Sequence, residues 1–167
     1  MTSVKFQKQC GSCYAFTVIS VIESAYILKG KYFNLAEQEL VDCSNPYGNF
    51  GCTGGWTTNA YKYIKDLGVV VERDYPYNAI SNKCNVGKGK VKKGIINYVE
   101  LKKDCFVVIE ALKNQPLSIA INANGWQYYA KGIYTDCRPG ESNHGVVLAG
   151  VDSTSWLIKN SWGYSWG

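Results

Sequence analysis

The sequence has one histidine, His144, and no apolar run long enough to cross a lipid bilayer. The longest apolar helix that it predicts, residues 15–28, contains serine residues and Glu23. Residues 1–8 lack the apolar segment of a secretory signal peptide. We therefore expect no membrane-spanning segment and no membrane partner.

Internal repeats and low-complexity linkers are also absent from the sequence. Charged residues are only 19% of the 167 residues and hydrophobic ones are 46%, which is an ordinary globular balance without a sign of disorder. A chain of this length can bury a substantial core, so we expect one compact unit.

A nucleic-acid-binding motif is missing too, although the net charge is +5. Lysines gather in one region, where they indicate a solvated strand and turn, and we expect no nucleic-acid partner. These lysines are Lys88, Lys90, Lys92, Lys93, Lys102 and Lys103.

What the sequence does contain is a cysteine at the start of an apolar helix. Residues 9–16 read QCGSCYAF, and residues 15–28 are apolar on most sides, as in a buried central helix. Gly30 is the expected stop of this helix. Cys13 therefore lies at or next to the helix N-terminus, where free N–H groups and the helix dipole favour the nucleophilic thiolate.

The single histidine and one asparagine stand at informative distances from Cys13. His144 follows it by 131 positions, in the stretch SNHGVV, and Asn160 follows it by 147, in the stretch KNSWG. These separations are typical of a Cys–His–Asn site. From about Val4 to Gly167 the sequence resembles the papain and cathepsin L cysteine proteases.

The resemblance implies an α+β fold with two lobes. Residues 1–97 would form a helical lobe that carries the nucleophile, and residues 98–167 an antiparallel, β-barrel-like lobe that carries the histidine and asparagine. The sequence pattern agrees with a helical half followed by a strand half, and we expect the active site in the groove between them. Helices are expected at residues 15–28, 34–43, 58–67 and 104–113, and strands at 117–121, 132–134, 146–149 and 156–158.

The same resemblance implies peptide-bond hydrolysis through a thioester intermediate, with no metal and no organic cofactor. Cys13 would attack the carbonyl, and His144 would hold the thiolate as an ion pair and then donate its proton to the leaving amine. Asn160 would orient the imidazole, and Trp162 would shield that hydrogen bond from water.

Gln7, six positions before Cys13, matches the oxyanion-hole glutamine of the family. Its N–H group and the Cys13 backbone N–H would stabilise the oxygen that becomes negative during attack. The chain departs from the family at Lys8 and Gln9, where relatives usually have small residues, and at Tyr14, where tryptophan is commoner.

The resemblance also implies substrate-binding residues. Gly54 and Gly55 would line the cleft and pair with the substrate backbone, because adjacent glycines allow close approach. The second subsite would have small residues at Ala120 and Gly145, so we expect room there for a bulky apolar side chain such as leucine or phenylalanine. The remaining positions implied by the resemblance are Trp56, Thr57, Ser142 and Asn143, the last of which matches the cathepsin L pattern.

Seven cysteines favour an oxidising compartment. Alignment with the family pairs Cys10 with Cys52 and Cys43 with Cys84, whereas the expected partner of Cys137 would lie beyond Gly167. A bridge between Cys137 and Cys105 is a weaker alternative, and we expect Cys105 to be a small buried apolar residue near a helix start.

Three alternatives compete with the protease hypothesis. The spacing of Cys10 and Cys13 also fits a dithiol redox motif, but no strand precedes it. A zinc site would use the same two cysteines with two later ones, and the sequence has no second close pair to complete it. An inactive, protease-like binding module is the third, and it usually lacks a catalytic residue.

Both ends of the chain look cut when compared with the family, whose members carry a signal peptide and an inhibitory propeptide and continue past Gly167. The resemblance therefore implies a lysosomal, vacuolar or secreted zymogen. Its partners would be protein or peptide substrates, its own propeptide and cystatin-like inhibitors, and it would be a monomer. We expect residues 1–167 alone to be insoluble or inactive, because a sheet edge would stay unpaired.

Overall fold

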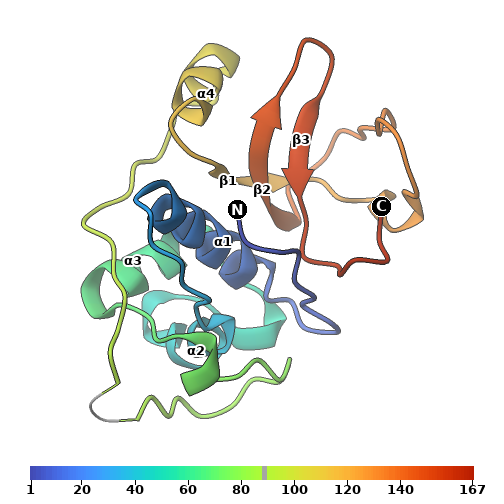
Figure 1. Cartoon of the computed structure of the whole chain (residues 1–167). Coiled ribbons are helices and arrows are strands. Elements are labelled where there is room, and N and C mark those ends of the chain that lie inside the picture. Colours follow the sequence, from blue (N-terminus) through green and yellow to red (C-terminus); the bar gives the residue numbers. More distant parts are fainter. Residues whose placement is uncertain (88–89) are drawn as a thin grey trace.

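The computed structural model describes residues 1–87 and 90–167. Helix α1, Cys13–Leu28, lies at the centre, with α2, Glu37–Cys43, and α3, Thr57–Leu67, on one side of it (Figure 1). A three-stranded sheet lies on the other side, and the N-terminal segment enters between the two. The active-site residues that the sequence predicts come from both sides of this arrangement.

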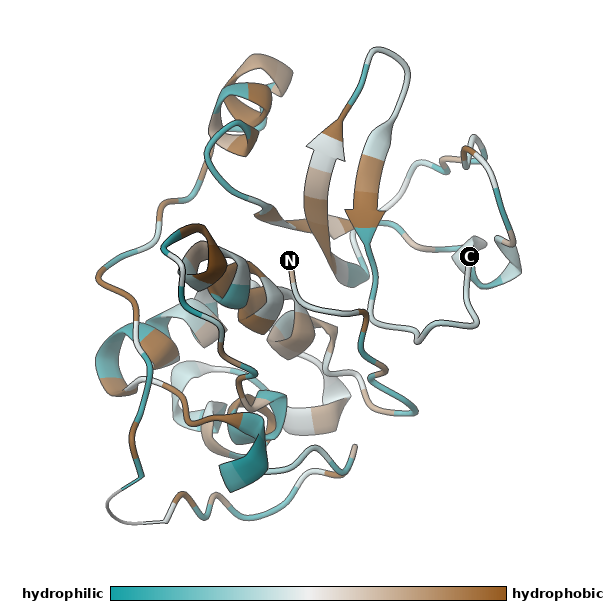
Figure 2. Ribbon diagram, in the orientation of Figure 1, coloured by the Kyte–Doolittle hydropathy of each residue, from teal (hydrophilic) through white to brown (hydrophobic). Residues whose placement is uncertain are grey.

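Helix α1 is buried because its sequence is apolar almost all round. Every residue from Tyr14 to Ser24 is buried, including Glu23, and Figure 2 shows the helix as one of the most apolar parts of the chain. The helix ends at Leu28, and Gly30 follows with φ +71°, a left-handed conformation that favours glycine. The predicted helix and its stop are confirmed.

The helical side has its own core and two disulfides. The largest side chains of this core come from the three helices and the segments between them, among them Tyr14, Ile19, Leu35, Leu40 and Ile64. Cys10 is bonded to Cys52 and Cys43 to Cys84, the two pairs that the family resemblance implied. Short 3₁₀ turns connect the helices at Asn45–Tyr47, Gly51–Thr53 and Glu72–Asp74.

The sheet contains β1, Leu117–Ile121, β2, His144–Val151, and β3, Trp156–Lys159, in that spatial order. Both pairs of strands are antiparallel, and Ile121 lies opposite His144. A bulge between Leu148 and Gly150 shifts the register of β2 against β3. A further 3₁₀ turn, Trp126–Tyr128, lies in the long connection between β1 and β2.

The expected α+β class is confirmed, and so are α4, Cys105–Leu112, and the strands near residues 117–121, 146–149 and 156–158. The expected strand at residues 132–134 is wrong. Gly132 has φ +79°, outside the β region, and Tyr134 packs its ring on Trp126 and Tyr129 instead of joining a sheet. Within the described residues the sheet is open rather than a closed barrel, and the division at residues 97 and 98 stays a prediction.

The lysine region is only partly solvated, contrary to expectation. The Lys92 ammonium lies 2.6 Å from a carboxylate oxygen of Glu39, which is fully buried, and Lys93 lies over the ring of Phe33. Lys90 pairs with Asp74 at 3.0 Å, whereas Lys88 lies outside the described residues. The segment is therefore attached to the helical side by its lysines.

Cys105 is exposed, so its expected burial is wrong. Asp104 caps α4 by accepting a hydrogen bond from the Val107 N–H at 3.0 Å, and this places Cys105 in the first turn at the surface. Cys137 is also exposed, and neither cysteine is bonded to the other. No helix among the described residues is long and apolar enough to cross a membrane.

Replacing Ile19 with alanine tests whether α1 carries the core of the helical side. The Ile19 side chain is fully buried, so its truncation leaves a cavity, and we expect a loss of about 2–5 kcal/mol in the free energy of unfolding. Urea denaturation of the native protein that contains this chain measures the loss. Ile96→Ala is the control, because that side chain is 94% exposed, and an equal loss in both variants would contradict the assignment.

Candidate active site

Cys13 is the first residue of α1, and the loop before it is held from several directions. The Gly11 N–H donates to the Cys52 carbonyl at 2.8 Å, beside the Cys10–Cys52 disulfide. A Cβ atom on Gly11 would lie 2.6 Å from that carbonyl oxygen, so only glycine fits here. The Ser12 hydroxyl is 2.7 Å from that of Tyr77. Cys13 is thus a free, partly exposed thiol at a fixed helix start, where its own N–H has no partner within the helix.

Gln7 is buried beside this loop. Its side-chain Nε2 donates to the Cys10 carbonyl at 2.9 Å, and its Oε1 accepts a hydrogen bond from the Ser161 hydroxyl at 2.7 Å. The Cys10 contact settles which end of the amide carries the N–H groups, because a carbonyl oxygen can only accept. Because Nε2 has two N–H groups and the Cys10 carbonyl takes one, the other remains to meet a ligand oxygen.

His144 opens strand β2 and is buried. Its Nε2 lies 2.8 Å from Oδ1 of Asn160, the residue that follows β3. The indole of Trp162 packs against the imidazole with 4.9 Å between ring centroids. The expected pairing of His144 with Asn160 and the position of Trp162 beside it are therefore present in the structure.

The orientation of the Asn160 amide determines the protonation of the imidazole. Oδ1 also accepts the Ser161 backbone N–H at 2.8 Å, so the oxygen end must face this side. Nε2 of His144 must then be the donor, which leaves Nδ1 to exchange a proton with another group.

Burial lowers the pKa of His144, and the hydrogen bond with Asn160 opposes that shift. The unfolded chain therefore binds the proton more tightly than the folded one. The contribution of His144 to stability is present above the ordinary histidine pKa, about 6.5, and is lost as the pH falls through the lower folded value.

Two contacts bring the sheet side of the site to Cys13. Strand β2 packs so closely on α1 that a Cβ atom on Gly145 would lie 3.6 Å from the Cys13 carbonyl group and 3.2 Å from the Thr17 hydroxyl. The N-terminal segment pairs with the residues after Asn160, because the Gln7 N–H donates to the Ser161 carbonyl at 2.9 Å. The predicted catalytic residues thus converge on the start of α1.

The predicted substrate-binding residues fall into two groups. Gly54 has φ +121°, and Gly55 is required because a Cβ atom there would lie 2.4 Å from the Asn49 side-chain oxygen. That oxygen also accepts the backbone N–H of Trp56, whose indole is exposed. Thr57 begins α3 directly after it. This first group is joined to the nucleophile loop through the neighbouring Cys52.

The second group lies on the sheet. Ala120 in β1 is exposed and pairs with Gly145, and Ser142 is exposed just before β2. Asn143 has a structural contact, since its Oδ1 accepts the Ala123 N–H at 2.9 Å and holds the turn after β1. That the two groups line one cleft stays a prediction.

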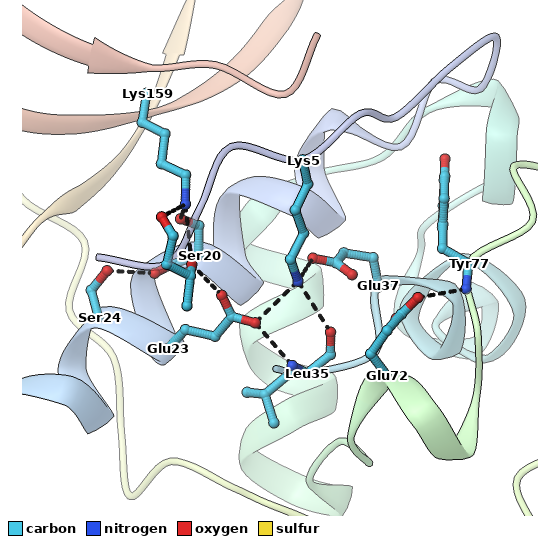
Figure 3. A network of polar contacts seen from close by, with 10 residues as sticks. Lys5, Ser20, Glu23, Ser24, Leu35, Glu37, Glu72, Tyr77 and Lys159 are labelled. Atoms are coloured by element: carbon cyan, nitrogen blue, oxygen red, sulfur yellow. Dashed lines mark hydrogen bonds and ion pairs between the residues drawn. The ribbon is translucent and has the colours of Figure 1, made fainter. Parts of the chain in front are cut away.

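Sequence reasoning missed a buried charge network next to the site (Figure 3). The Lys5 ammonium lies 2.6 Å from Glu37 and 3.1 Å from Glu23, and Lys159 donates to the Ser20 hydroxyl at 2.7 Å. Burial raises the pKa of Glu37 to about 7, although Lys5 opposes the shift. The one sequence signal was Glu23, a charge within an apolar helix that needs a partner when buried.

Comparison with known proteins identifies the protein family to which a site of this geometry belongs. A family profile described as papain family cysteine protease matches residues 1–167. The chain therefore belongs to the papain family of cysteine proteases.

Within that family the chain is similar to cathepsins of the L type. Cathepsin L 2 of Paramecium tetraurelia is 40% identical over an alignment of 167 positions that covers 99% of this chain and 52% of the relative. Digestive cysteine proteinase 3 of Homarus americanus is 41% identical, with 100% of this chain and 56% of the relative covered. The chain thus spans about half the length of these relatives.

Solved structures agree on the fold. Procathepsin L 3 from the larval midgut of Tenebrio molitor superimposes with a TM-score of 0.92 at 36% identity, covering all of this chain and 58% of that one. A cysteine protease of Carica candamarcensis in complex with E-64 gives 0.89 at 32% identity, covering all of this chain and 80% of that one.

Removing the Asn160 side chain should lower the pKa of His144. The amide hydrogen bond favours the charged imidazole, so Asn160→Ala leaves only burial to act on it. NMR titration measures the effect without an assignment problem, because the sequence has one histidine. The titration uses a Cys13→Ala background, in which no thiolate perturbs the imidazole.

Asn143→Ala is the matched control for this titration. Asn143 adjoins His144 in sequence, but its side chain contacts Ala123 and Asn124 instead. We expect the control to leave the pKa of His144 unchanged. An unchanged or raised pKa in Asn160→Ala would contradict the role given to the amide.

Proposed function

We propose that the protein is a papain-like cysteine endopeptidase that hydrolyses peptide bonds through a thioester intermediate. The observation that carries the proposal is the 2.8 Å contact between His144 and an Asn160 amide of fixed orientation, on a strand packed against the start of α1. This arrangement supports an imidazole that exchanges its Nδ1 proton with Cys13. Membership of the family supports the same chemistry.

In the acylation step the Cys13 thiolate attacks the substrate carbonyl carbon, and the carbonyl oxygen becomes negative. The Cys13 N–H and the free N–H of Gln7 donate to that oxygen. His144, protonated by the cysteine, donates its proton to the leaving amine as the C–N bond breaks. The acyl group then remains on Cys13 as a thioester.

In the deacylation step a water molecule attacks the thioester carbonyl, and neutral His144 takes its proton. Collapse of the tetrahedral intermediate breaks the C–S bond, and the acid product leaves. The proton returns from His144 to the sulfur, so the enzyme is restored. Asn160 and Trp162 keep the imidazole in place, and no cofactor enters the scheme.

The alternatives have less support. A dithiol pair of Cys10 and Cys13 conflicts with the disulfide that joins Cys10 to Cys52. The same bond, with the one between Cys43 and Cys84, engages thiols that a zinc site would need. An inactive binding module is disfavoured because Gln7, Cys13, His144 and Asn160 are all present.

The partners and location follow from the same proposal. Papain-like proteases act on peptides and carry propeptides, and a procathepsin is among the structural neighbours. We extend this to protein or peptide substrates, an inhibitory propeptide and cystatin-like inhibitors for this protein, acting as a monomer. The two disulfides fit a lysosomal, vacuolar or secreted location.

The second subsite is proposed at Trp56, Thr57, Ala120, Ser142 and Gly145. The exposed Trp56 indole and the exposed Ala120 offer apolar surface, and Gly145 adds no side chain. A peptide library should therefore show a preference for leucine or phenylalanine at this subsite. A profile that favours small or acidic residues would reject the assignment, and Ala120→Glu should weaken cleavage of the preferred peptides.

Limiting iodoacetamide at pH 6 should label Cys13 before any other cysteine. Cys13 lies at a helix start and, under this proposal, passes its proton to His144, which makes its sulfur the most nucleophilic of the free cysteines. We expect a rate at least about tenfold higher at Cys13, measured by mass spectrometry of the native protein.

The chain supplies its own controls for this labelling. Cys105 and Cys137 are free and more exposed than Cys13, so access alone would favour them. E-64, which is bound to the Carica candamarcensis protease, should protect only Cys13. Earlier labelling of Cys105 or Cys137 would oppose the protease proposal, and equal labelling of Cys10 and Cys13 would indicate a redox dithiol.

A further inference from the structure

A small cavity of about 20 Å³, partly open to the solvent, lies next to the His144–Asn160 pair. It is bounded by α1, by strand β2 and by the N-terminal segment, and a single water molecule needs roughly 10–15 Å³. The polar residues that line it are Lys5, Thr17, Ser20, Glu23, Glu37, Lys159, Asn160 and Ser161. The cavity therefore has both the size and the polarity of a water site.

Asn160 supplies a donor that lacks a partner. The residue is only 6% exposed, and its Nδ2 makes no hydrogen bond with any described residue. The amide cannot turn to use another group, because the Ser161 N–H and His144 hold Oδ1 on the opposite side. Buried amides without a partner are rare and destabilising, so this one indicates a missing small ligand.

An acceptor lines the same cavity. Glu37 accepts the Lys5 ammonium through Oε1 at 2.6 Å, and its other carboxylate oxygen, Oε2, receives no hydrogen bond within the described residues (Figure 3). Both oxygens of Glu23 are already used, by Thr2 at 2.5 Å and by Lys5 at 3.1 Å. Glu37 is therefore the carboxylate with spare capacity.

We propose that one ordered water molecule occupies this cavity, accepts a hydrogen bond from Asn160 Nδ2 and donates one to Glu37. The water connects the amide that orients His144 to the buried charge network between the helical side and the sheet. Asn160 then has a partner at both ends of its amide, which restricts the side chain to the orientation that His144 needs. Lys5 and Glu37 thereby become positioning residues that act on Asn160 through the water.

The water itself does not depend on the proposed protease function, whereas its effect on catalysis does. A crystal structure of the native protein at 1.5 Å or better should show one full-occupancy water within hydrogen-bond distance of Asn160 Nδ2. NMR should show a magnetisation transfer from a long-lived water to the Asn160 side-chain amide protons. An empty cavity, or an Asn160 Nδ2 bonded to a protein group, would overturn the inference.

Two variants of Val147, which also lines the cavity, separate the water from general packing. Val147→Ile fills the space and expels the water, whereas Val147→Ala enlarges the space and keeps it. Only the isoleucine variant should lose the water signal and lower kcat/KM by roughly tenfold, the factor that one lost buried hydrogen bond supplies. The alanine variant should lose stability but keep the water signal.

The outcomes distinguish the two proposals. A native protein with the water but without peptidase activity would reject the protease function alone. A native protein with activity and an empty cavity would reject the water alone. Equal kcat/KM in the two Val147 variants, with the water expelled from one, would show that the water does not position Asn160.

Discussion

The close approach of strand β2 to the first turn of α1 is the constraint on which the site depends. It occurs at Gly145, where a Cβ atom would stand 3.6 Å from the Cys13 carbonyl group. Because no side chain separates the two elements, the residue before Gly145 is brought to the helix start. That residue is His144, and antiparallel pairing with β3 then places Asn160 just past Lys159, which lies opposite Val147.

The sequence predicts those parts of the molecule that have local signals. Residues close together in the sequence predict the apolar helix α1, its end at Gly30 and the end of α3 at Gly68. Family resemblance adds what local patterns cannot supply, since the separation between Cys13 and His144 has no physical meaning until the fold brings them together. The hydrogen bond between His144 and Asn160 lies where that resemblance places it.

The parts that sequence reasoning misses are decided by distant neighbours. Residues 132–134 look like a strand, but no strand of the described residues pairs with them, and the Tyr134 ring packs on Trp126 and Tyr129 instead. In the sequence Lys92 looks like a surface lysine, but its ammonium forms an ion pair with the carboxylate of Glu39, which is fully buried. Lys5 and Lys159 look equally ordinary, because a charged residue in sequence gives no indication of the charge that the fold will place beside it.

Hydrophobic packing alone could join the helical side to the sheet, yet a network of charged side chains lies between these two layers. Glu23 and Glu37 are fully buried and Lys5 and Lys159 are partly buried, which costs desolvation energy, and ion pairs of this kind often add little net stability. Removing one partner would nevertheless leave an uncompensated charge, so each side chain tolerates only one arrangement of its neighbours. The directional contact that joins the sheet to α1 is the hydrogen bond from Lys159 of β3 to the Ser20 hydroxyl at 2.7 Å, and it restricts the position of the sheet along the helix. The nucleophile comes from the helical side and the base from the sheet. The site therefore depends more on a fixed relative position of these two layers than on the extra stability of an apolar interface.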